Sequence, residues 1–172
     1  GGDGTATKGI SQGLADFFAA AQSVAASPAS LADRRVFLEK AQELATKFNT
    51  ADARLETLQQ GLSDRVTAEV AEANALVTEI AKLNEAIVSE EALAPGYAND
   101  LRDSRQLKLE ALSKLVKIDT AEQENGAINV SIAGNLVVDG RDVAGTLETF
   151  DAGGGNLQVR LAGQGTALAL TG

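Results

Sequence analysis

One helical pattern continues without interruption from Leu31 to about Ser89, and it constrains the fold more than any other feature of the chain. No proline lies within it, and its one glycine, Gly61, weakens a helix by roughly 1 kcal/mol without ending it. Ser30 stands just before the pattern as a favourable N-cap, with Asp33 at the third position after it. Such a helix would be roughly 90 Å long, whereas a helix in a globular protein averages about 11 residues. The pattern therefore predicts a rod.

The apolar residues of this segment recur at alternating steps of three and four, which is typical of a coiled-coil seam. Two four-residue steps in succession, between Leu62 and Val70, predict a stutter that locally unwinds the supercoil. We expect this face to pack against other helices. The apolar positions are Phe37, Ala41, Leu44, Phe48, Ala51, Leu55, Leu58, Leu62, Val66, Val70, Ala73, Leu76, Ile80, Leu83 and Ile87.

A shorter helix is predicted on each side of the rod. The first covers about 10–26 and ends at Ser27-Pro28, because proline excludes the preceding residue from helical geometry. Residues 1–9, rich in glycine and threonine, are expected to form an arm. The second covers about 99–114 and follows a loop that contains Pro95-Gly96. Short connections make neighbouring helices antiparallel, so each short helix should lie along one half of the rod.

Each half of the rod would then have a single partner in this chain, which is too few to cover its apolar surface. We therefore expect another chain, or sequence outside this one, to complete the bundle, and we expect the chain to expose an apolar seam and to self-associate weakly. The four phenylalanines of the helices lie on faces that should meet, which favours a core over an aromatic binding strip. The residues expected in the inter-helix packing or assembly seam are Phe17, Phe18, Phe37, Leu44, Phe48, Leu55, Leu62, Val70, Ile80, Ile87, Leu101 and Leu112, with either Leu107 or Leu109 beside the last two.

After Leu115 the apolar period changes from helical to two-fold, which indicates β-strands. Asn125-Gly126 separates two alternating segments and is a strong hairpin signal, and Gly134-Asn135 makes a second tight turn. Glycine-rich turns separate the remaining strands, which are predicted over Thr146–Phe150, Leu157–Leu161 and Ala167–Leu170.

These segments predict an α+β chain in two parts. Residues 1–114 should form an elongated helical rod domain, in which one very long helix over 31–89 is flanked by two shorter antiparallel helices. Residues 115–172 should form a small antiparallel β domain. Its side chains are small, so its core must be thin.

Composition excludes several kinds of function. The net charge of −9 disfavours nucleic acid and anionic membranes as partners. The chain contains neither cysteine nor histidine, so it can form no disulfide, no imidazole base and no metal site built on those residues. Residues 1–30 show no signal peptide, and no apolar run is long enough for a transmembrane helix. We expect no cofactor, no metal and no enzymatic activity.

Carboxylate pairs are the remaining candidates for catalysis, at Glu90-Glu91 and at Asp100 with Asp103, as in a glycosidase. A structural interpretation is stronger. Asp100 and Asp103 fall in the first turn of a predicted helix, where the macrodipole favours negative charge. Gly153-Gly154-Gly155-Asn156 favours a flexible turn over a calcium loop, because the calcium motif repeats and this segment occurs once.

Two segments resemble the early helical part of the flagellar hook-associated protein 1 family. Leu14 to Asn49 carries a Leu-x-x-Phe-Phe helix, a proline turn, an Arg-x-Val step and an Ala-x-x-Leu-x-x-x-Phe-Asn run. Asn99 to Ile118 is similar to the family's Asn-Asp-Leu-x-Asp-x-Arg stretch and the leucines that follow it, although Gln106 stands where an acidic residue is usual. An Ile-Ala-x-Leu-Asn pattern at Ile80 to Asn84 also resembles the family.

The resemblance implies a structural component of the bacterial flagellum, exported without a cleaved signal peptide, that forms a ring between hook and filament. Its partners would be further copies of itself, the neighbouring hook protein and a second junction protein. The helical domain would pack in the tube wall and the β domain would project outward. The family's terminal polymerisation helices, and a C-terminal helix that returns along the rod, would lie outside this chain.

Two other functions suit parts of the sequence. A surface-exposed binding module or adhesin could present a β head on a helical stalk, but the β region contains one aromatic residue, Phe150, where a binding face would be richer in them. A carboxylate-based hydrolase would need a deep pocket with two facing acids, for which a thin core leaves little room.

Overall fold

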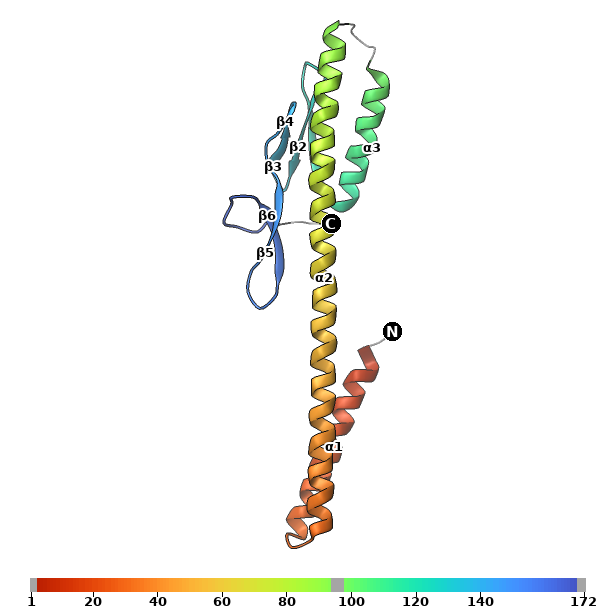
Figure 1. Cartoon of the computed structure of the whole chain (residues 1–172), viewed down its shortest axis with the longest axis vertical. Helices are drawn as coiled ribbons and strands as arrows, with labels where there is room; N and C mark the ends of the chain where they lie inside the picture. Colours follow the sequence, from red (N-terminus) through yellow and green to blue (C-terminus); the bar gives the residue numbers. More distant parts are fainter. Residues whose placement is uncertain (1–2, 94–97, 170–172) are drawn as a thin grey trace. The chain divides into compact units, whose positions relative to one another are not determined.

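The computed structural model describes residues 3–93 and 98–169. Three helices precede the strands: α1 (Asp3–Ala26), α2 (Leu31–Leu93) and α3 (Asn99–Leu115) (Figure 1). This confirms the predicted α+β class, with one very long helix followed by antiparallel strands. The chain divides into two compact units, Gly1–Gly61 and Leu62–Gly172, and helix α2 contributes to both.

The helices begin and end close to the predicted positions, with one clear error. Helix α1 begins at Asp3, so the arm predicted over residues 1–9 is wrong for its described residues 3–9. Glycine lowers helix stability by about 1 kcal/mol but does not end a helix, and no proline precedes Pro28. Helix α2 continues to Leu93, four residues past the predicted end, and the Pro95-Gly96 loop lies outside the described residues. The Ser30 cap is confirmed, since its hydroxyl accepts the Asp33 backbone N–H at 3.2 Å.

In the first unit, α1 packs against the first part of α2. The two helices come close at Gly13, which is buried. A Cβ atom added there would lie 3.1 Å from Lys47 Cδ and 3.2 Å from Leu44 Cδ1. One turn further along α1, the Phe17 and Phe37 rings are in contact, with centroids 5.1 Å apart. Glycine at position 13 therefore permits the two helices to approach each other closely, and the contact between Phe17 and Phe37 stabilises this arrangement.

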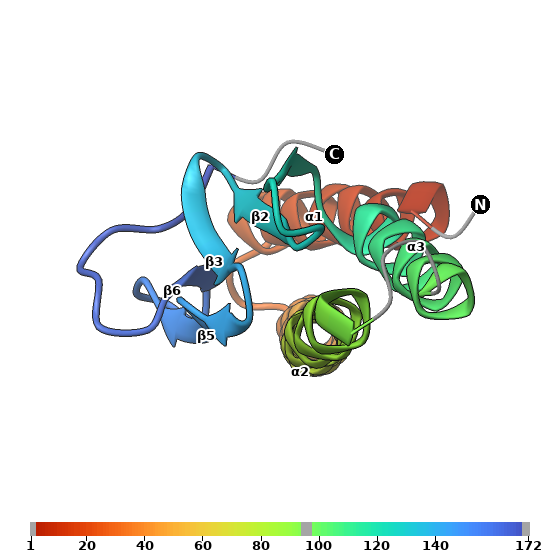
Figure 2. The same ribbon diagram turned by 90° about the horizontal axis from the view of Figure 1, so that it is seen from above.

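In the second unit, two antiparallel sheets pack with α3 around the remaining part of α2, as Figure 2 shows in the view from above. The first sheet has the order β1-β2-β3-β4, and the second pairs β5 with β6. The strands are β1 (Ile118–Glu122), β2 (Ile128–Ile132), β3 (Asn135–Asp139), β4 (Asp142–Val143), β5 (Leu147–Asp151) and β6 (Leu157–Leu161).

Both predicted hairpins are present. The turn with Asn125-Gly126 joins β1 to β2, which pair from Ile118 opposite Ile132 to Glu122 opposite Ile128. The turn between β2 and β3 consists of Ala133 and Gly134, both at positive φ, one residue earlier than the predicted Gly134-Asn135 turn, because Asn135 already belongs to β3. The strand predicted over Ala167–Leu170 is wrong for its described residues 167–169, where a single backbone bond joins the Leu168 N–H to Val159 O at 2.8 Å. Strand β4 was missed because two residues are too few to show an alternating pattern.

One hydrophobic core joins α2, α3 and both sheets. The small side chains of the strands cannot form a core alone, so they pack on the helices. The predicted domain boundary at 114/115 falls inside this core, and the compact units divide the chain at Gly61 instead. The core residues are Ala73, Leu76, Val77, Ile80, Ala81, Leu109, Leu112, Val130, Ile132, Val137, Val138, Leu147 and Leu161.

Two asparagine side chains of α2 hold the strands in place. Asn84 is fully buried, and its Nδ2 donates to Ile128 O at 2.8 Å and to Gly140 O at 2.6 Å. Its Oδ1 accepts the Ile128 N–H at 3.2 Å. Asn74 makes a reciprocal pair with the Leu147 backbone, with both bonds 2.8 Å long. Because each amide satisfies strand backbone groups that β pairing leaves open, the two residues set where each sheet meets the helix.

Arg105 of α3 completes the Asn84 cluster. It is buried, and its Nη1 donates to Asn84 Oδ1 and to Gly126 O, both at 2.8 Å. Burial lowers the pKa of its guanidinium, because desolvation disfavours the charged form. The cluster therefore connects α2, α3 and the β1–β2 turn, which are distant from one another in sequence.

Arg102 links the same elements nearer the surface. Its Nε and Nη2 donate to the two carboxylate oxygens of Glu91, each at 2.9 Å, and its Nη1 donates to Glu122 at 3.1 Å. The hydrogen bond from Arg102 lowers the pKa of Glu91 below its ordinary value. Glu91 is thus a structural ion-pair partner of Arg102.

We expect Asn84→Ala to destabilise the second unit by about 3 kcal/mol, because it removes one of the two acceptors of Arg105 Nη1 and the amide partner of three backbone groups, Ile128 N–H, Ile128 O and Gly140 O. Hydrogen exchange of the β2 and β3 amides measures this loss directly. Asn49→Ala is the matched control, since Asn49 is exposed on the same helix, and it should change stability by less than about 0.5 kcal/mol. Unchanged exchange in the Asn84 variant would contradict the assigned role.

Candidate assembly surface

The structure divides the predicted seam residues into three groups. Ile80, Ile87 and Leu112 are fully buried in the second unit. A second group is partly buried, and a third is exposed. The partly buried residues are Phe17, Phe37, Leu44, Val70 and Leu101, and the exposed ones are Phe18, Phe48, Leu55 and Leu62.

The prediction that all four helical phenylalanines form a core is therefore wrong for Phe18 and Phe48. Phe18 is 60% exposed, and its ring forms a T-shaped pair with that of Phe17, with centroids 5.5 Å apart. The physical reason is that α1 covers one face of α2, and only Phe17 and Phe37 lie on the faces that meet. Of Leu107 and Leu109, the two alternatives on α3, Leu109 is buried and Leu107 is exposed.

Some exposed apolar residues of the first unit were not among the predicted seam residues. Leu31 and Leu38 lie seven residues apart, on a face of α2 different from that of Phe37. Their spacing of seven residues was a signal of a second apolar stripe. Leu58 is also exposed and outside the predicted seam, and it lies one turn after the exposed seam residue Leu55.

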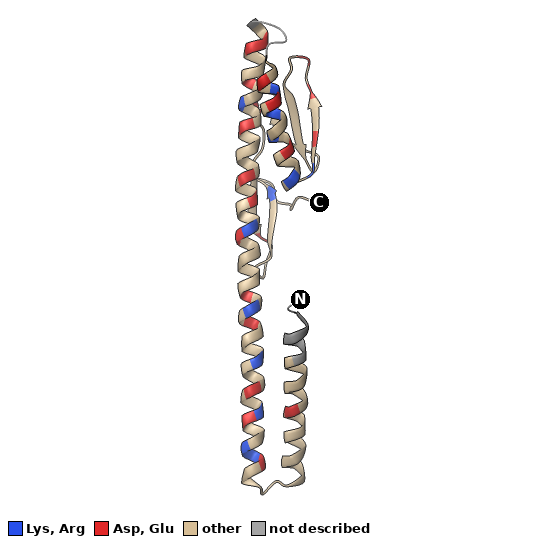
Figure 3. Ribbon diagram, turned by 90° about the vertical axis from the view of Figure 1, so that its right-hand side faces the viewer, with Lys and Arg blue, Asp and Glu red and all other residues tan. Residues whose placement is uncertain are grey.

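Helix α1 adds a surface almost without charge. Between residues 9 and 26 its one ionisable side chain is Asp16, as Figure 3 shows by colour. The exposed residues in this range are otherwise alanine, serine, glutamine, Leu14 and Phe18. A surface helix normally carries charged residues on its solvent face, so this composition is typical of a helix that packs against protein on more than one side.

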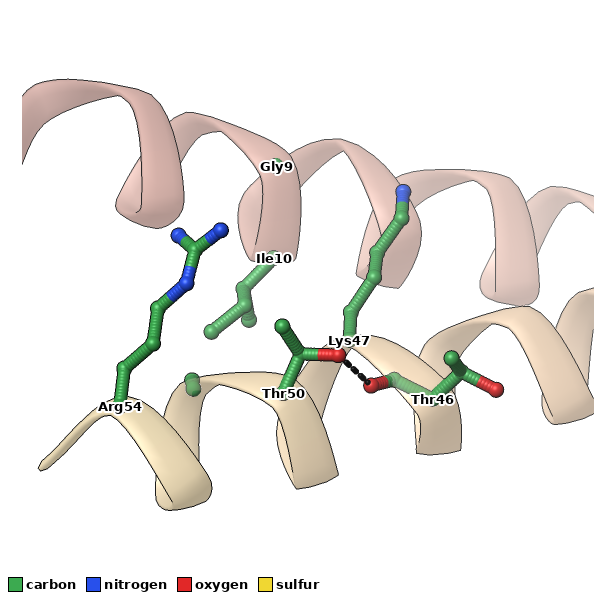
Figure 4. A pocket seen from close by; sticks show the side chains of 7 residues that line it. Gly9, Ile10, Thr46, Lys47, Thr50 and Arg54 are labelled. Atoms are coloured by element: carbon green, nitrogen blue, oxygen red, sulfur yellow. Dashed lines mark hydrogen bonds between the residues drawn. The ribbon is translucent and has the colours of Figure 1, made fainter. Parts of the chain in front are cut away.

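A groove of about 170 Å³ lies between α1 and the first part of α2. Figure 4 shows Lys47 and Arg54 rising from α2 on either side of Ile10, which points down from α1. The hydroxyls of Thr46 and Thr50 donate to Gln42 O and Thr46 O of their own helix, so the groove surface between the cations is apolar. We call this feature the Lys47–Arg54 groove. Its lining residues are Gly9, Ile10, Thr46, Lys47, Thr50, Ala51 and Arg54.

A second recess, of about 160 Å³, lies in the second unit where α2, the end of α3 and the β5–β6 sheet meet. Its lining is mostly branched apolar side chains, and its acid, Glu69, accepts a hydrogen bond from Arg65 at 2.8 Å. Neither recess was predicted, because each forms from segments that are distant in sequence. The lining residues are Val66, Glu69, Val70, Ala73, Leu115, Val116, Leu147 and Val159.

Of the carboxylates considered as catalytic pairs, Glu91 is bound by Arg102, and the others are exposed: Glu90, Asp100 and Asp103. Asp100 lies in the first turn of α3. Asp151 accepts the Gly153 backbone N–H at 2.8 Å, which closes the glycine-rich turn. Among the described residues, no group of three or more acids is placed to hold a metal ion. No helix in the described ranges has the length and apolarity to cross a membrane.

Comparison with known proteins identifies relatives along nearly the whole chain. A family model described as the helical domain of flagellar hook-associated protein FlgK matches residues 3–171. The chain is similar to flagellar hook-associated protein 1 of Salmonella typhimurium, with 28% identity over 125 residues, 72% of this chain and 23% of the relative. It is similar to the Escherichia coli K12 protein of that name, with 26% identity over 130 residues, 75% of this chain and 24% of the relative.

A solved structure shows the same fold. The flagellar hook junction protein FlgK from Burkholderia pseudomallei superposes with a TM-score of 0.79 and 27% identity, over 96% of this chain and 30% of that one. The chain thus spans less than a third of the length of the relatives it matches.

Alanine substitutions should separate the buried from the exposed seam residues. Leu112→Ala should destabilise the second unit by about 2–5 kcal/mol, because it opens a cavity in a closed core. Leu55→Ala should change stability by less than about 0.5 kcal/mol, because the side chain is mostly in water. Urea unfolding followed by circular dichroism measures both. A large loss for Leu55→Ala would contradict its placement.

Proposed function

Because the chain belongs to the family of the helical domain of flagellar hook-associated protein FlgK, we propose that it is part of a structural protein that joins the hook to the filament of a bacterial flagellum. The family match over residues 3–171 carries this proposal. The superposition on a hook junction protein supports it independently, because it compares coordinates along nearly the whole chain.

The described surface suits a role in assembly. The first unit exposes Phe18, Leu31, Leu38, Leu55 and Leu58 on helices, where a protein that works alone would bear polar residues. A nearly uncharged α1 extends this surface. Burying such residues against neighbouring helices would stabilise a contact by the hydrophobic effect, at about 25 cal/mol per Å² of apolar area.

The mechanism that follows is mechanical. The second unit has a closed core fixed by Asn74, Asn84 and Arg105, so it resists deformation. The first unit, with fewer buried residues, supplies contacts to neighbouring subunits. Load would pass between hook and filament through these helix contacts, in a ring of copies that also meets the hook protein and a second junction protein.

The same proposal includes an extracellular location, reached by export without a cleaved signal peptide. The sequence is compatible with export out of the cell, because it has no cysteine that could be oxidised there.

Immunogold labelling tests the proposal. Antibodies raised against this chain should label flagella of the bacterium that encodes it at one position, between hook and filament. Label spread evenly along the filament would contradict a junction role. Label on the cell surface of a strain that makes no flagella would favour an adhesin instead.

A further inference from the structure

The Lys47–Arg54 groove presents charges in a defined order along α2. Glu43, Lys47, Thr50 and Arg54 follow at steps of four, three and four, which places them on one helix face. Neither Lys47 nor Arg54 has an ion-pair partner among the described residues. The stem of Lys47 is positioned by α1, since it passes 3.1 Å from where a Gly13 Cβ would stand. The groove therefore offers two positioned cations with an apolar surface between them.

The outward face of α3 carries charged residues in an order complementary to that of the Lys47–Arg54 groove. Asp103, Leu107, Glu110 and Lys114 also follow at steps of four, three and four, and all are exposed. Leu107 is 66% exposed, whereas Leu109 and Leu112 of the same helix are buried in the core. Asp103 has no ion-pair partner in the described part of the chain, and the Glu110 carboxylate accepts a hydrogen bond from Gln106 at 3.1 Å. We call these four residues the Leu107 face.

We propose that the Leu107 face of one copy docks into the Lys47–Arg54 groove of a second copy. With the two helices antiparallel, the steps match at every position. Leu107 meets the methyl group of Thr50, Glu110 meets Lys47, and Asp103 meets Arg54. Lys114 then lies beside Glu43, so three pairs of opposite charge surround one apolar contact.

The distribution of charge favours this pairing over others. Residues 1–61 contain seven acids and six basic residues, whereas residues 62–172 contain 17 acids and nine basic residues. Two acidic surfaces would repel each other, so a copy's second unit is best matched to the near-neutral first unit of another copy. Within that first unit, the groove is where two unpaired cations flank apolar surface.

The contact is heterologous, because each copy uses a different surface at its two ends. Contacts of this kind propagate from copy to copy and close into a ring when the rotation permits. The inference thus rests on the proposed function and names one contact between its subunits. Association in solution should pass beyond dimers and weaken as salt screens the ion pairs.

Sedimentation velocity of the chain over a concentration series tests the contact. Lys47→Glu with Arg54→Glu, and separately Asp103→Lys with Glu110→Lys, should each weaken association by about tenfold or more. Combining all four changes in one chain should restore it, because both surfaces are then reversed. Lys82→Glu with Lys117→Glu is the matched control, with the same change of net charge at exposed positions, and should alter association by less than about twofold.

Leu107→Ser provides a second variant that leaves every charge in place, and it should also weaken association. Circular dichroism verifies that each variant keeps its helix content. The inference is overturned if the chain stays monomeric at all concentrations, if the charge reversals have no effect, or if the fourfold variant fails to recover. Junction labelling by immunogold combined with any of these results would leave the proposed function standing and remove this contact alone.

Discussion

The length of helix α2 is the constraint on which the rest of the structure depends. An uninterrupted helix of 63 residues carries apolar side chains along its whole course, and the rest of the described chain covers them unequally. In the second unit α3 and two sheets enclose Ile80, while in the first unit α1 alone shields Phe37. The same helix is therefore a core element in one unit and a largely open surface in the other. That difference is the physical basis for the assembly role that we propose.

Polar side chains, rather than apolar ones, determine how the second unit is put together. Apolar packing of small residues such as Val130 and Val137 has no directional preference. By itself it would therefore tolerate shifts of the sheet along the helix. The hydrogen bonds of Asn74 and Asn84 do have direction, and they join particular strand backbone groups to particular turns of α2. Arg105 adds a buried charge that has few alternative partners. We infer that this cluster selects one arrangement of helix and sheet among several of similar hydrophobic energy.

The sequence predicted the elements with local signals and missed those that depend on distant contacts. The Ser30 cap, the Asn125-Gly126 hairpin and the long helix all follow from neighbouring residues, and all are present. The family could also be inferred, because its motifs are local. The role of Asn84 was missed, although an asparagine amid the apolar positions of a buried helix was a signal. Its partners lie 44 and 56 residues away, beyond any periodicity.

The candidate surface was predicted less well than the fold, for a related reason. Heptad spacing indicates which residues share a face, but it cannot say whether the covering element belongs to the same chain. Ile80 and Leu55 belong to the same heptad pattern, but α3 and both sheets enclose Ile80, whereas the side chain of Leu55 is 65% exposed. Phe17 and Phe18 are adjacent in sequence, so which of them faces α2 depends on how α1 is rotated about its own axis. The structure shows that Phe17 does.

The central claim is that the exposed apolar residues of α2 are covered in the assembled flagellum. The chain has no cysteine, so Leu55→Cys introduces a unique thiol at an exposed position. Its rate of labelling by a thiol reagent should be fast in the isolated chain and much slower in intact flagella purified from the bacterium. Equal rates in the two samples would contradict the claim.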